Sequence, residues 1–361
     1  MASTENAHTV GDLRQMQSLS LESKILMTKQ RIQAWYDYWD GYIYIYISFS
    51  GGKDSTVLLD IARQVYPDIK AVYVDTGLEY PEVRNFVKSV NNVEWLHPVK
   101  WDKHKREYVR TNFKEVILEH GYPLVSKEIA ECIQDAKKSI ARNDGTYSYR
   151  LKRLNGELLD KNGKKSKYNC PKWRFLLDAP FNVSNLCCDI MKKNPTHDFE
   201  KKTGLHPVLG TLADESSLRL QKWLKNGCNA FNNKRPVSQP LSFWREQDIL
   251  LYLLKYDKSY AEVYGKIIGR YKDLEFSTSR LKKIMEKAPK TWEDRIELAT
   301  TGAERTGCMF CGFGCHLEKS PNRFQRMKET HPKQYEYCLR PVEQGGLGMA
   351  EVLDYIGVDY K

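Results

Sequence analysis

Residues 43–60 constrain the fold more than any other stretch of this 361-residue chain. β-Branched and aromatic residues alternate as far as Phe49, a pattern that predicts a strand. A polar glycine turn follows, and apolar residues then recur at helical spacing. The turn consists of Ser50, Gly51, Gly52, Lys53, Asp54 and Ser55. Glycines let backbone N–H groups approach phosphate oxygens, and the helix N-terminus adds positive dipole. We therefore expect residues 50–55 to bind the phosphates of a nucleotide.

This turn is not the Walker form, which needs four residues between its first glycine and the Gly-Lys pair. Ser-Gly-Gly-Lys-Asp-Ser resembles instead the loop of the ATP pyrophosphatase (PP-loop) superfamily. The resemblance implies an enzyme that splits ATP between the α and β phosphates with Mg²⁺, in many cases to adenylate a substrate. It assigns residues 50–55 to the nucleotide, and Lys53 and Asp54 also to catalysis. A glycine turn without such a role is the plain alternative.

Length and composition favour two domains, or one large domain with additions, and a hydrophobic content of 41% supplies a sizeable core. No apolar run approaches the length of a membrane span, and residues 1–11 lack the apolar core of a signal peptide. The nine cysteines follow no regular secreted-type framework. Together with the nucleotide loop, these features predict a cytoplasmic protein with no membrane partner, whose cysteines are reduced or metal-bound.

The net charge of +11 is concentrated in a basic insertion, residues 137–174, where Lys and Arg far outnumber Asp and Glu. The same segment contains Tyr147, Tyr149, Tyr168 and Trp173. Interleaved basic and aromatic side chains suit a polyanion whose bases stack, so a tRNA or DNA partner is one interpretation. A solvated insertion with no partner is the other.

Helical and strand patterns alternate after the loop. Strands are expected over residues 69–75, 93–98 and 207–212, and helices over residues 55–64, 83–90, 104–120 and 127–141. Parallel strands place ligands at their carboxyl ends, so Asp75, Thr76 and Gly77 should lie on the same edge as the loop. Asp75 could accept a ribose hydroxyl or orient Mg²⁺, or it could simply cap a helix.

This rhythm predicts an α/β fold, a doubly wound and mostly parallel sheet of the adenine-nucleotide α-hydrolase kind, with an N-terminal helix and a mainly helical C-terminal region. We expect a helical segment over residues 1–40, a nucleotide-binding domain over 41–260 that contains the basic insertion, and a region over 261–361 that carries a Cys-x-x-Cys segment. Turn signals between residues 143 and 163 predict a hairpin over residues 147–158.

Five cysteines form two groups, Cys187-Cys188 and Cys308-x-x-Cys311-x-x-x-Cys315. A Cys-x-x-Cys in a glycine-rich turn suits metal ligation, because the turn aims both sulfurs at one point. Adjacent cysteines pair poorly in a disulfide but can both reach one cluster. Thiolates of Cys187, Cys188, Cys308 and Cys311 would fit tetrahedral zinc or a [4Fe–4S] cluster. Buried free cysteines are the plain alternative.

The surroundings favour iron. Cys-Cys-Asp-Ile-Met-Lys192-Lys-Asn-Pro, followed far downstream by Cys308-x-x-Cys311, is similar to the pattern of the [4Fe–4S] adenylylsulfate reductases. The segment from Gly210 to Arg219 resembles the Gly-x-Arg-x-x-Glu-Ser-x-x-Arg segment of the wider phosphoadenylylsulfate (PAPS) reductase family. The resemblance covers roughly residues 42–320 and implies nucleotide contacts for Gly210, Glu215 and Ser216. It also implies that Lys192 and Arg219 act in catalysis on phosphate or sulfate, although a surface ion pair would explain either one.

Three departures limit this resemblance. The phosphate loop is intact, whereas reductases of this family bind an already activated sulfonucleotide and have degenerate loops. Leu212 stands where the family has Arg. The C-terminal Glu-Cys-Gly-Leu-His motif with its catalytic cysteine does not occur, and Cys338 lies in Tyr-Cys-Leu-Arg. The chain therefore resembles more closely the cluster-bearing branch that sulfurates nucleic acids, by DNA phosphorothioation or tRNA 2-thiolation.

That branch implies a specific chemistry. ATP adenylates an acceptor oxygen, and sulfur that reaches the site through a cluster or a persulfide, from a sulfur-donor protein, then displaces AMP. Loop N–H groups and Mg²⁺ would stabilise the leaving pyrophosphate. Cys315 is either a fifth thiol that carries the sulfur or a buried packing residue. Two other functions stay open: a sulfonucleotide reductase that forms sulfite, and a sulfate-adenylating enzyme, which would not need the cysteines.

Overall fold

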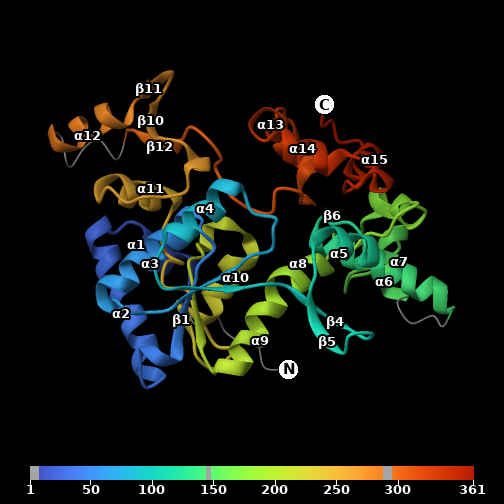
Figure 1. Cartoon of the computed structure of the whole chain (residues 1–361), viewed down its shortest axis with the longest axis horizontal. Helices are drawn as coiled ribbons and strands as arrows, with labels where there is room; N and C mark the ends of the chain where they lie inside the picture. The colour runs from blue at the N-terminus through green and yellow to red at the C-terminus, as the bar shows by residue number, and fades with distance from the viewer. Residues whose placement is uncertain (1–7, 144–147, 288–294) are drawn as a thin grey trace. The chain divides into compact units, whose positions relative to one another are not determined.

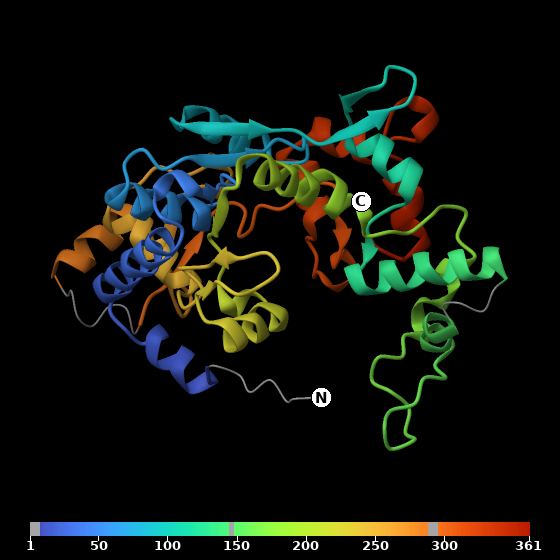
Figure 2. The same cartoon turned by 90° about the horizontal axis from the view of Figure 1, so that it is seen from below.

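The computed structural model describes residues 8–143, 148–287 and 295–361 (Figures 1 and 2). The chain divides into two compact units. The first consists of Met1–Asp75, Glu79–Leu96 and Thr196–Thr306, and the second of Thr76–Leu78, His97–Pro195 and Gly307–Lys361. The expected ranges 41–260 and 261–361 therefore each contribute to both units.

A six-stranded sheet forms the centre of the first unit, with strand order β3-β2-β1-β7-β9-β8. Its members are β1 (Ile45–Ser48), β2 (Ala71–Val74), β3 (Val93–Leu96), β7 (His206–Leu209), β8 (Asn229–Ala230) and β9 (Val237–Ser238). All neighbouring strands are parallel except β8 and β9. In the register of the sheet, Ile47 lies between Ala71 and Val208. The predicted mixed α/β fold with a mostly parallel sheet is confirmed.

Helices surround this sheet and complete its core. They are α1 (Val10–Gln17), α2 (Leu21–Tyr38), α3 (Lys53–Val65), α4 (Pro81–Ser89), α10 (Ser217–Asn226) and α11 (Glu246–Lys255). The hydroxyls of Thr9 and Ser20 accept backbone N–H groups at the starts of α1 and α2, which explains where these helices begin. Trp35 of α2 is fully buried in the same core as Ile47 and Trp244.

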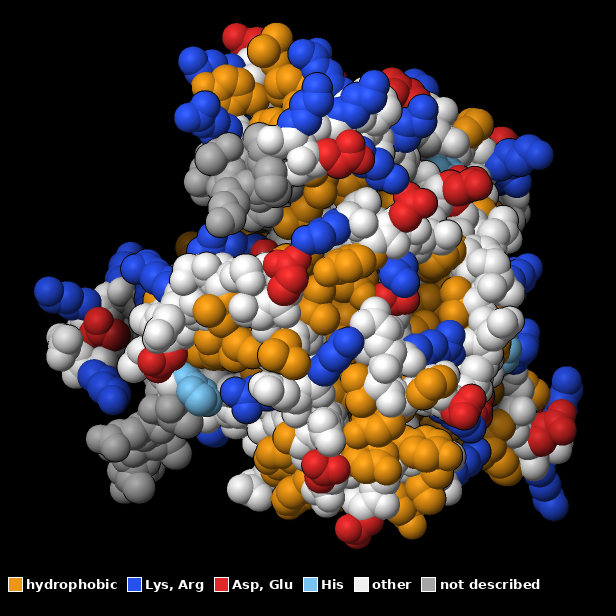
Figure 3. All heavy atoms as spheres, turned by 90° about the vertical axis from the view of Figure 1, so that its left-hand side faces the viewer, with side chains coloured by type: hydrophobic (Ala, Val, Ile, Leu, Met, Phe, Trp, Pro, Cys, Tyr) orange, Lys and Arg blue, Asp and Glu red, His pale blue; other side chains and the backbone are white. Residues whose placement is uncertain are grey.

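Some large hydrophobic side chains of the first unit remain exposed. They include Leu26 on α2 and, in and after the turn that ends α2, Tyr38, Tyr42, Ile43 and Tyr44. Figure 3 shows hydrophobic side chains in several patches on the left-hand side of the view in Figure 1, separated by charged side chains. The rings of Tyr36 and Tyr66 stack at 4.3 Å, so part of this aromatic surface is packed against itself.

A second, antiparallel sheet of the first unit has the order β11-β10-β12. It consists of β10 (Ile267–Tyr271), β11 (Leu274–Phe276) and β12 (Glu297–Thr300), and α12 (Thr278–Lys287) accompanies it. Gly269 lets α12 approach, because a Cβ there would meet Leu281 Cδ2 and Ile296 Cγ2 at 2.5 Å. This sheet replaces the helices expected after residue 261, and its strands are short and carry charges such as Arg270 and Glu275.

The second unit is mainly helical, with short strands. Its helices are α5 (Phe113–His120), α6 (Lys127–Arg142), α7 (Ser148–Asn155), α8 (Leu186–Cys188), α13 (Arg323–Thr330), α14 (Pro332–Leu339) and α15 (Met349–Tyr355). Strands β4 (Val99–Asp102) and β5 (Glu107–Arg110) form an antiparallel hairpin, and β6 (Leu124–Val125) pairs in parallel with β13 (Gly312–Phe313). Helix α9 (Asn194–Thr203) begins in this unit and ends in the first.

Two local predictions for this unit are wrong. The helix expected over residues 104–120 begins only at Phe113, where the Asn112 side chain accepts the N–H of Glu115, and residues 99–110 form the β4–β5 hairpin instead. The hairpin expected over residues 147–158 is the helix α7, whose one face buries Arg153 and Leu154. An isolated antiparallel bridge between residues 159 and 165 is what remains of it.

Much of the charge in the basic insertion is engaged within the second unit. Lys137 donates to the carbonyls of Ala179 and Phe181, and burial lowers its pKa. Arg153 is buried and pairs with Glu128 at 2.6 Å. The loop after α7 carries four exposed lysines, Lys161, Lys164, Lys165 and Lys167. Figure 2 shows this loop in green, projecting from α6 and α7. Tyr168 is exposed there, whereas Tyr147 lies outside the described residues.

Among the described helices α2 is the longest, and neither it nor any other combines the length and the apolar character that crossing a membrane requires.

Candidate active site

The predicted phosphate loop connects β1 to α3 as expected. Gly52 caps α3, and the helix begins at Lys53. The Ser55 hydroxyl accepts the N–H of Ser50 at 3.2 Å and donates to the Gly52 carbonyl at 2.9 Å. These bonds fold the loop back over the first turn of the helix, at the positive end of the helix dipole. This arrangement is typical of an anion-binding turn.

Gly51 is the residue that allows this turn. Its φ of +71° lies in the left-handed region, and a Cβ there would meet Val87 Cγ2 at 2.6 Å and Val83 Cγ1 at 2.8 Å. Both valines are buried in α4, so neither can move without disturbing the core. The backbone conformation and the packing therefore both require glycine at this position.

We expect Gly51→Ala to destabilise the first unit by about 2–4 kcal/mol, from the backbone strain of about 1–2 kcal/mol and overpacking of similar size. Urea denaturation followed by tryptophan fluorescence measures the change. Gly204→Ala is the matched control, because Gly204 has a φ of +72° with nothing within 4 Å of its would-be Cβ. Equal losses of stability in the two variants would contradict the role of the α4 contact.

Lys53 is almost completely buried, and it contacts polar groups that come from distant positions in the sequence of the first unit. Its Nζ lies 3.1 Å from a Glu246 carboxylate oxygen and 3.0 Å from the Glu304 carbonyl oxygen. Its backbone N–H donates to the Tyr264 hydroxyl at 3.2 Å, and that hydroxyl lies 2.7 Å from the Thr306 hydroxyl. Oxygen atoms thus surround both the ammonium and the N–H at the start of the helix, where phosphate oxygens would bind.

Asp54 and Arg219 lie in the same electrostatic environment. Burial raises the pKa of Asp54, while Lys53 and Arg305 act in the opposite direction. Burial lowers the pKa of Arg219, and the neighbouring guanidinium of Arg305 adds to this effect. Two guanidinium groups close enough to repel each other are typical of a site that accepts an anion. Arg219 also contacts Glu215, one turn earlier, in the ion pair that the sequence analysis names as the plain alternative.

The predicted segment from Gly210 to Ser216 follows β7 and lies against the loop. A Cβ on Gly210 would approach both the Asp54 carbonyl oxygen and Ser55 Cα at 3.1 Å, so Gly210 packs directly on the loop backbone. Ser216 caps α10 and accepts the N–H of Arg219. A Glu215 carboxylate oxygen accepts the N–H of Leu212. Gly210 and Arg219 therefore belong to the loop environment, whereas Glu215 and Ser216 support the turn that carries Arg219.

Asp75 is buried at the end of β2, and both of its carboxylate oxygens accept hydrogen bonds from Arg84, at 2.7 and 3.1 Å. Its charge is thus balanced by a residue of α4 that the sequence analysis does not name. Thr76 and Gly77 follow in the second unit. The Thr76 hydroxyl accepts the N–H of Leu78, and Gly77 has a φ of +72° with open space around it.

All four candidate metal ligands belong to the second unit. Cys187 and Cys188 lie on α8, and Cys308 and Cys311 lie in the turn that leads into β13. None of the nine cysteines, all of which are described, forms a disulfide. Lys192, on the π-helical turn after α8, is in this unit too, so of the four predicted catalytic residues Lys53, Asp54 and Arg219 share a unit and Lys192 does not.

The segment around β6 brings the two cysteine pairs together. On one side, the N–H of Tyr122 donates to the Asn182 carbonyl, and Tyr122 forms a parallel bridge with Val183, shortly before Cys187. On the other side, β6 pairs with β13, which begins directly after Cys311. A Cβ on Gly312 would lie 2.6 Å from the Pro123 carbonyl oxygen, so β13 reaches β6 only with glycine there. Val125 of β6 has a φ of +63°, which costs a β-branched residue energy and is typical of functional sites.

The thiols lie within electrostatic range of one another. Both Cys308 and Cys311 contribute to the raised pKa of Cys187, whose largest cause is its hydrogen bond to Cys188. That same bond lowers the pKa of Cys188 to about 6, and Lys127 and Lys192 act in the same direction. Burial raises the pKa of Cys311 to about 11. In the described parts of the chain, however, no three His, Cys, Asp or Glu side chains converge closely enough to hold a single metal ion.

The two remaining cysteines of interest are buried. Cys315 donates to the Gly312 carbonyl at 3.0 Å, and burial raises its pKa to about 11. Cys338 has no exposed surface, and burial raises its pKa. A thiol that carries sulfur must be accessible and ionisable. The packing alternative for Cys315 therefore has the stronger support.

Sequence reasoning misses several residues of these sites. Glu246, Tyr264 and Arg305 approach the loop from far along the chain, and Lys127 approaches Cys188 from α6. No spacing in the sequence relates them to the motifs. One sequence signal could have indicated a loop near the site: residues 301–307 are small or polar, have no hydrophobic pattern and end immediately before Cys308.

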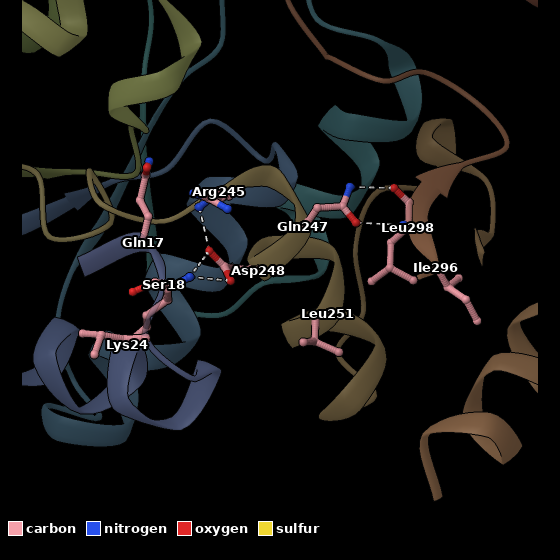
Figure 4. Close-up of a pocket in the computed structure, with 10 residues that line it drawn as sticks. Gln17, Ser18, Lys24, Arg245, Gln247, Asp248, Leu251, Ile296 and Leu298 are labelled. Carbon is pink, nitrogen blue, oxygen red and sulfur yellow. Dashed lines mark hydrogen bonds and ion pairs between the residues drawn. The ribbon is translucent and has the colours of Figure 1, made fainter. Parts of the chain in front are cut away.

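A cavity of about 390 Å³ elsewhere in the first unit is lined by residues of α1, α2, α11 and β12 (Figure 4). The ammonium of Lys24 donates to both carboxylate oxygens of Asp248 at 2.7 Å, and Gln247 forms two hydrogen bonds with the backbone of Leu298. Its lining contains none of the predicted site residues. The polar groups that Figure 4 joins are satisfied by each other, so this cavity supports the fold rather than nucleotide binding.

One known domain family matches part of this chain. Residues 44–139 match the model of the phosphoadenosine phosphosulfate reductase domain. This match supports the PAPS reductase family. It includes the phosphate loop and Asp75 and ends before either cysteine pair.

Two uncharacterized proteins of Methanocaldococcus jannaschii are similar in sequence. One is 21% identical over 307 residues, 85% of this chain and 49% of that protein, so the chain spans about half of that relative's length. The other is 38% identical over 80 residues, 22% of this chain and 15% of that protein. Among solved structures, a PAPS reductase from Candida auris in complex with phosphate has a TM-score of 0.35 at 14% identity, covering 68% of this chain and 91% of that one.

Proposed function

We propose that this chain is a cytoplasmic ATP pyrophosphatase of the PAPS reductase family that adenylates an acceptor on nucleic acid and transfers sulfur to it. The observation that carries the proposal is the intact loop, with Lys53, Asp54 and the two guanidinium groups of Arg219 and Arg305 in one environment. A triphosphate needs this much positive charge, which a degenerate loop would not supply. Nine cysteines without a disulfide support the cytoplasmic location.

In the proposed reaction an acceptor oxygen attacks the α phosphorus, and the bond between that phosphorus and the bridging oxygen to the β phosphate breaks. Pyrophosphate leaves with the negative charge that develops on this oxygen. Backbone N–H groups of the loop would stabilise this charge once the phosphates replace the Ser50 and Tyr264 hydroxyls, which accept the N–H groups of Gly52 and Lys53. Lys53 exchanges Glu246 and the Glu304 carbonyl for phosphate oxygens. Asp54, whose carboxylate is not held by a bidentate arginine as Asp75 is, would hold Mg²⁺.

We assign the cysteine group to a [4Fe–4S] cluster rather than to zinc because its sequence pattern is similar to that of the adenylylsulfate reductases. Each thiolate of such a cluster binds a different iron. The influence of Cys308 and Cys311 on the pKa of Cys187 supports one shared group for the four cysteines. Cys187, Cys188, Cys308 and Cys311 would hold the cluster, which would supply sulfur or electrons when bound. Lys127 and Lys192 favour the ionised form of Cys188, the form that ligates metal.

A nucleic acid is the proposed acceptor because the second unit carries exposed lysines in a loop with an exposed tyrosine. Lys164 and Lys165 lie there, and the Lys167 ammonium lies 5.5 Å from the Tyr168 ring centre. Charged loops of this kind contact phosphates, and aromatic rings beside them stack on bases.

We expect the double charge reversal Lys164→Glu and Lys165→Glu to weaken binding of a labelled tRNA and to flatten its salt dependence. Each lost phosphate contact should lower the slope of log Kd against log salt by about 0.7–0.9. Fluorescence anisotropy at several salt concentrations measures both effects. Lys328→Glu with Lys333→Glu, on α13 and α14 of the same unit, gives the same change in charge at another exposed surface. Equal weakening by both pairs would return the loop to the solvated-insertion interpretation.

A sulfonucleotide reductase is the second candidate, because the matching family model is that of PAPS reductase. The two functions separate in one anaerobic experiment. The purified protein is incubated with ATP and tRNA as acceptor, or with a sulfonucleotide and dithiothreitol as the two-electron reductant, and AMP, pyrophosphate and sulfite are measured. Pyrophosphate released from ATP supports the adenylating enzyme. Sulfite formed from the sulfonucleotide without ATP, together with no pyrophosphate released from ATP, would contradict the adenylating enzyme and support the reductase.

A further inference from the structure

The β4–β5 hairpin of the second unit has two unlike faces. Residues pair as Val99 with Arg110, Lys100 with Val109, Trp101 with Tyr108, and Asp102 with Glu107. Side chains alternate across a strand, so Val99, Trp101, Tyr108 and Arg110 share one face. The opposite face is tied to α5, where Lys100 pairs with Glu115 at 2.6 Å. Figure 1 shows the hairpin beside α5, running to a turn of its own.

The face that points away from α5 is aromatic and open to solvent. Trp101 is 52% exposed and Tyr108 is 69% exposed. Their ring centroids lie 5.1 Å apart at an interplanar angle of 71°, so the rings do not cover each other's faces as a parallel stack would. Val99 beside them is 40% exposed. Three large side chains in this position add little to the stability of the fold, which makes a binding role the better explanation.

The turn at the end of this face is positively charged. It carries Lys103, His104, Lys105 and Arg106, all exposed. Two carboxylates, Asp102 and Glu107, flank this turn. Asp102 accepts the backbone N–H groups of Lys105 and His104 at 3.1 and 2.9 Å, and these bonds lower its pKa. Asp102 therefore shapes the turn and holds the basic residues in a fixed arrangement. Arg110 adds a further cation at the other end of the aromatic face.

We propose that this hairpin binds an unpaired stretch of a nucleic acid strand, with bases on Trp101 and Tyr108 and phosphates on the basic turn. This inference rests on the proposed function, in which the acceptor is a nucleic acid, and it specifies which form of nucleic acid binds. Aromatic rings beside cations on a rigid ribbon are the recurring recognition elements for single strands. Bases within a duplex are already stacked on each other, so the exposed ring faces select unpaired nucleotides.

The test measures binding alone and therefore does not depend on ATP cleavage. A dye-labelled, 20-nucleotide single strand of mixed sequence is titrated with the full chain, and anisotropy gives Kd. Trp101→Ala and Tyr108→Ala should each raise Kd by about tenfold, from the loss of one stacked base. Lys103→Ala with Lys105→Ala should lower the salt slope by about 1.4 for two phosphate contacts. The same sequence as a duplex should bind more weakly.

Matched controls separate the surface from the fold. Tyr271→Ala and Leu274→Ala remove exposed side chains from the other hairpin, β10–β11, and should leave Kd unchanged. Trp101→Phe and Tyr108→Phe retain a ring and should retain most of the affinity. Equal Kd values for the wild type and both alanine variants would overturn the inference even if ATP is cleaved to AMP. Binding of phosphatidylserine vesicles but not of oligonucleotides through the same residues would overturn it too, in favour of a lipid surface.

Discussion

Lys53→Ala should lower the rate at which the protein converts ATP to AMP and pyrophosphate by about two to three orders of magnitude, as loss of one charge-stabilising group does elsewhere. Lys53 is the first residue of α3, and its side chain is almost completely buried. Without it the leaving pyrophosphate keeps the N–H groups of the loop but loses a full positive charge. A coupled pyrophosphate assay with labelled ATP measures the effect under anaerobic conditions.

Two further variants show whether this loss is chemical or structural. Lys53→Met keeps most of the buried stem and removes the charge, so it should be as inactive as Lys53→Ala while melting closer to the wild type. Lys70→Ala removes an exposed lysine of the same unit from its pair with Glu94 and should leave the rate unchanged. Full ATP cleavage in Lys53→Ala would refute the assignment of the loop.

Cys308→Ser should abolish the iron–sulfur chromophore. The wild type, purified without oxygen, should absorb broadly at roughly 400 nm, as thiolate-bound clusters do. A hydroxyl is a poor replacement for a thiolate, so iron and acid-labile sulfide should both fall in the variant. Cys228→Ser is the matched control: Cys228 lies in the first unit, where the Ser242 hydroxyl donates to its sulfur, and serine can accept the same bond.

The metal content decides between the open alternatives. A colourless wild type with one bound zinc would contradict the cluster and favour tetrahedral coordination. A colourless protein without metal would favour buried free cysteines. Neither result would affect the assignment of the phosphate loop, since Lys53 and the cysteines belong to different units.

The fold could be predicted well wherever local pattern and tertiary environment agree. Short, nearly continuous runs of β-branched, aromatic and other apolar residues predicted β1, β2 and β7, because both faces of a parallel sheet are buried. The β4–β5 hairpin was missed because one of its faces is exposed to solvent and the other contacts α5, so neither face is part of a hydrophobic core. Residues 104–112 also contain no hydrophobic repeat that distinguishes a strand from a helix. The sheet of β10, β11 and β12 was missed because its strands are joined by a helix and pair across some thirty residues.

The candidate site shows the same division. The position of the loop between a strand and a helix was predicted correctly, since its six contiguous residues determine the local geometry, and nucleotide binding by these residues stays a prediction. Arg305 and Tyr264 could not be predicted, because nothing local in their sequence refers to the loop and they reach it only through the folding of the first unit. The partner of Asp75 was also unpredictable: Arg84 lies one helix away and neutralises a carboxylate that sequence reasoning reserves for a ligand.

The position of β6 has a consequence for how the protein matures. Gly312 pairs with Leu124, so the second pair of cysteines can reach the first only after residues 308–313 have been synthesised and have left the ribosome. Until then Cys187 and Cys188 lack the other two proposed ligands, Cys308 and Cys311. An ion that binds earlier would have to dissociate before the complete group could form. Loading of this group should therefore be a late event that follows synthesis, and fragments that end before β13 should emerge without metal.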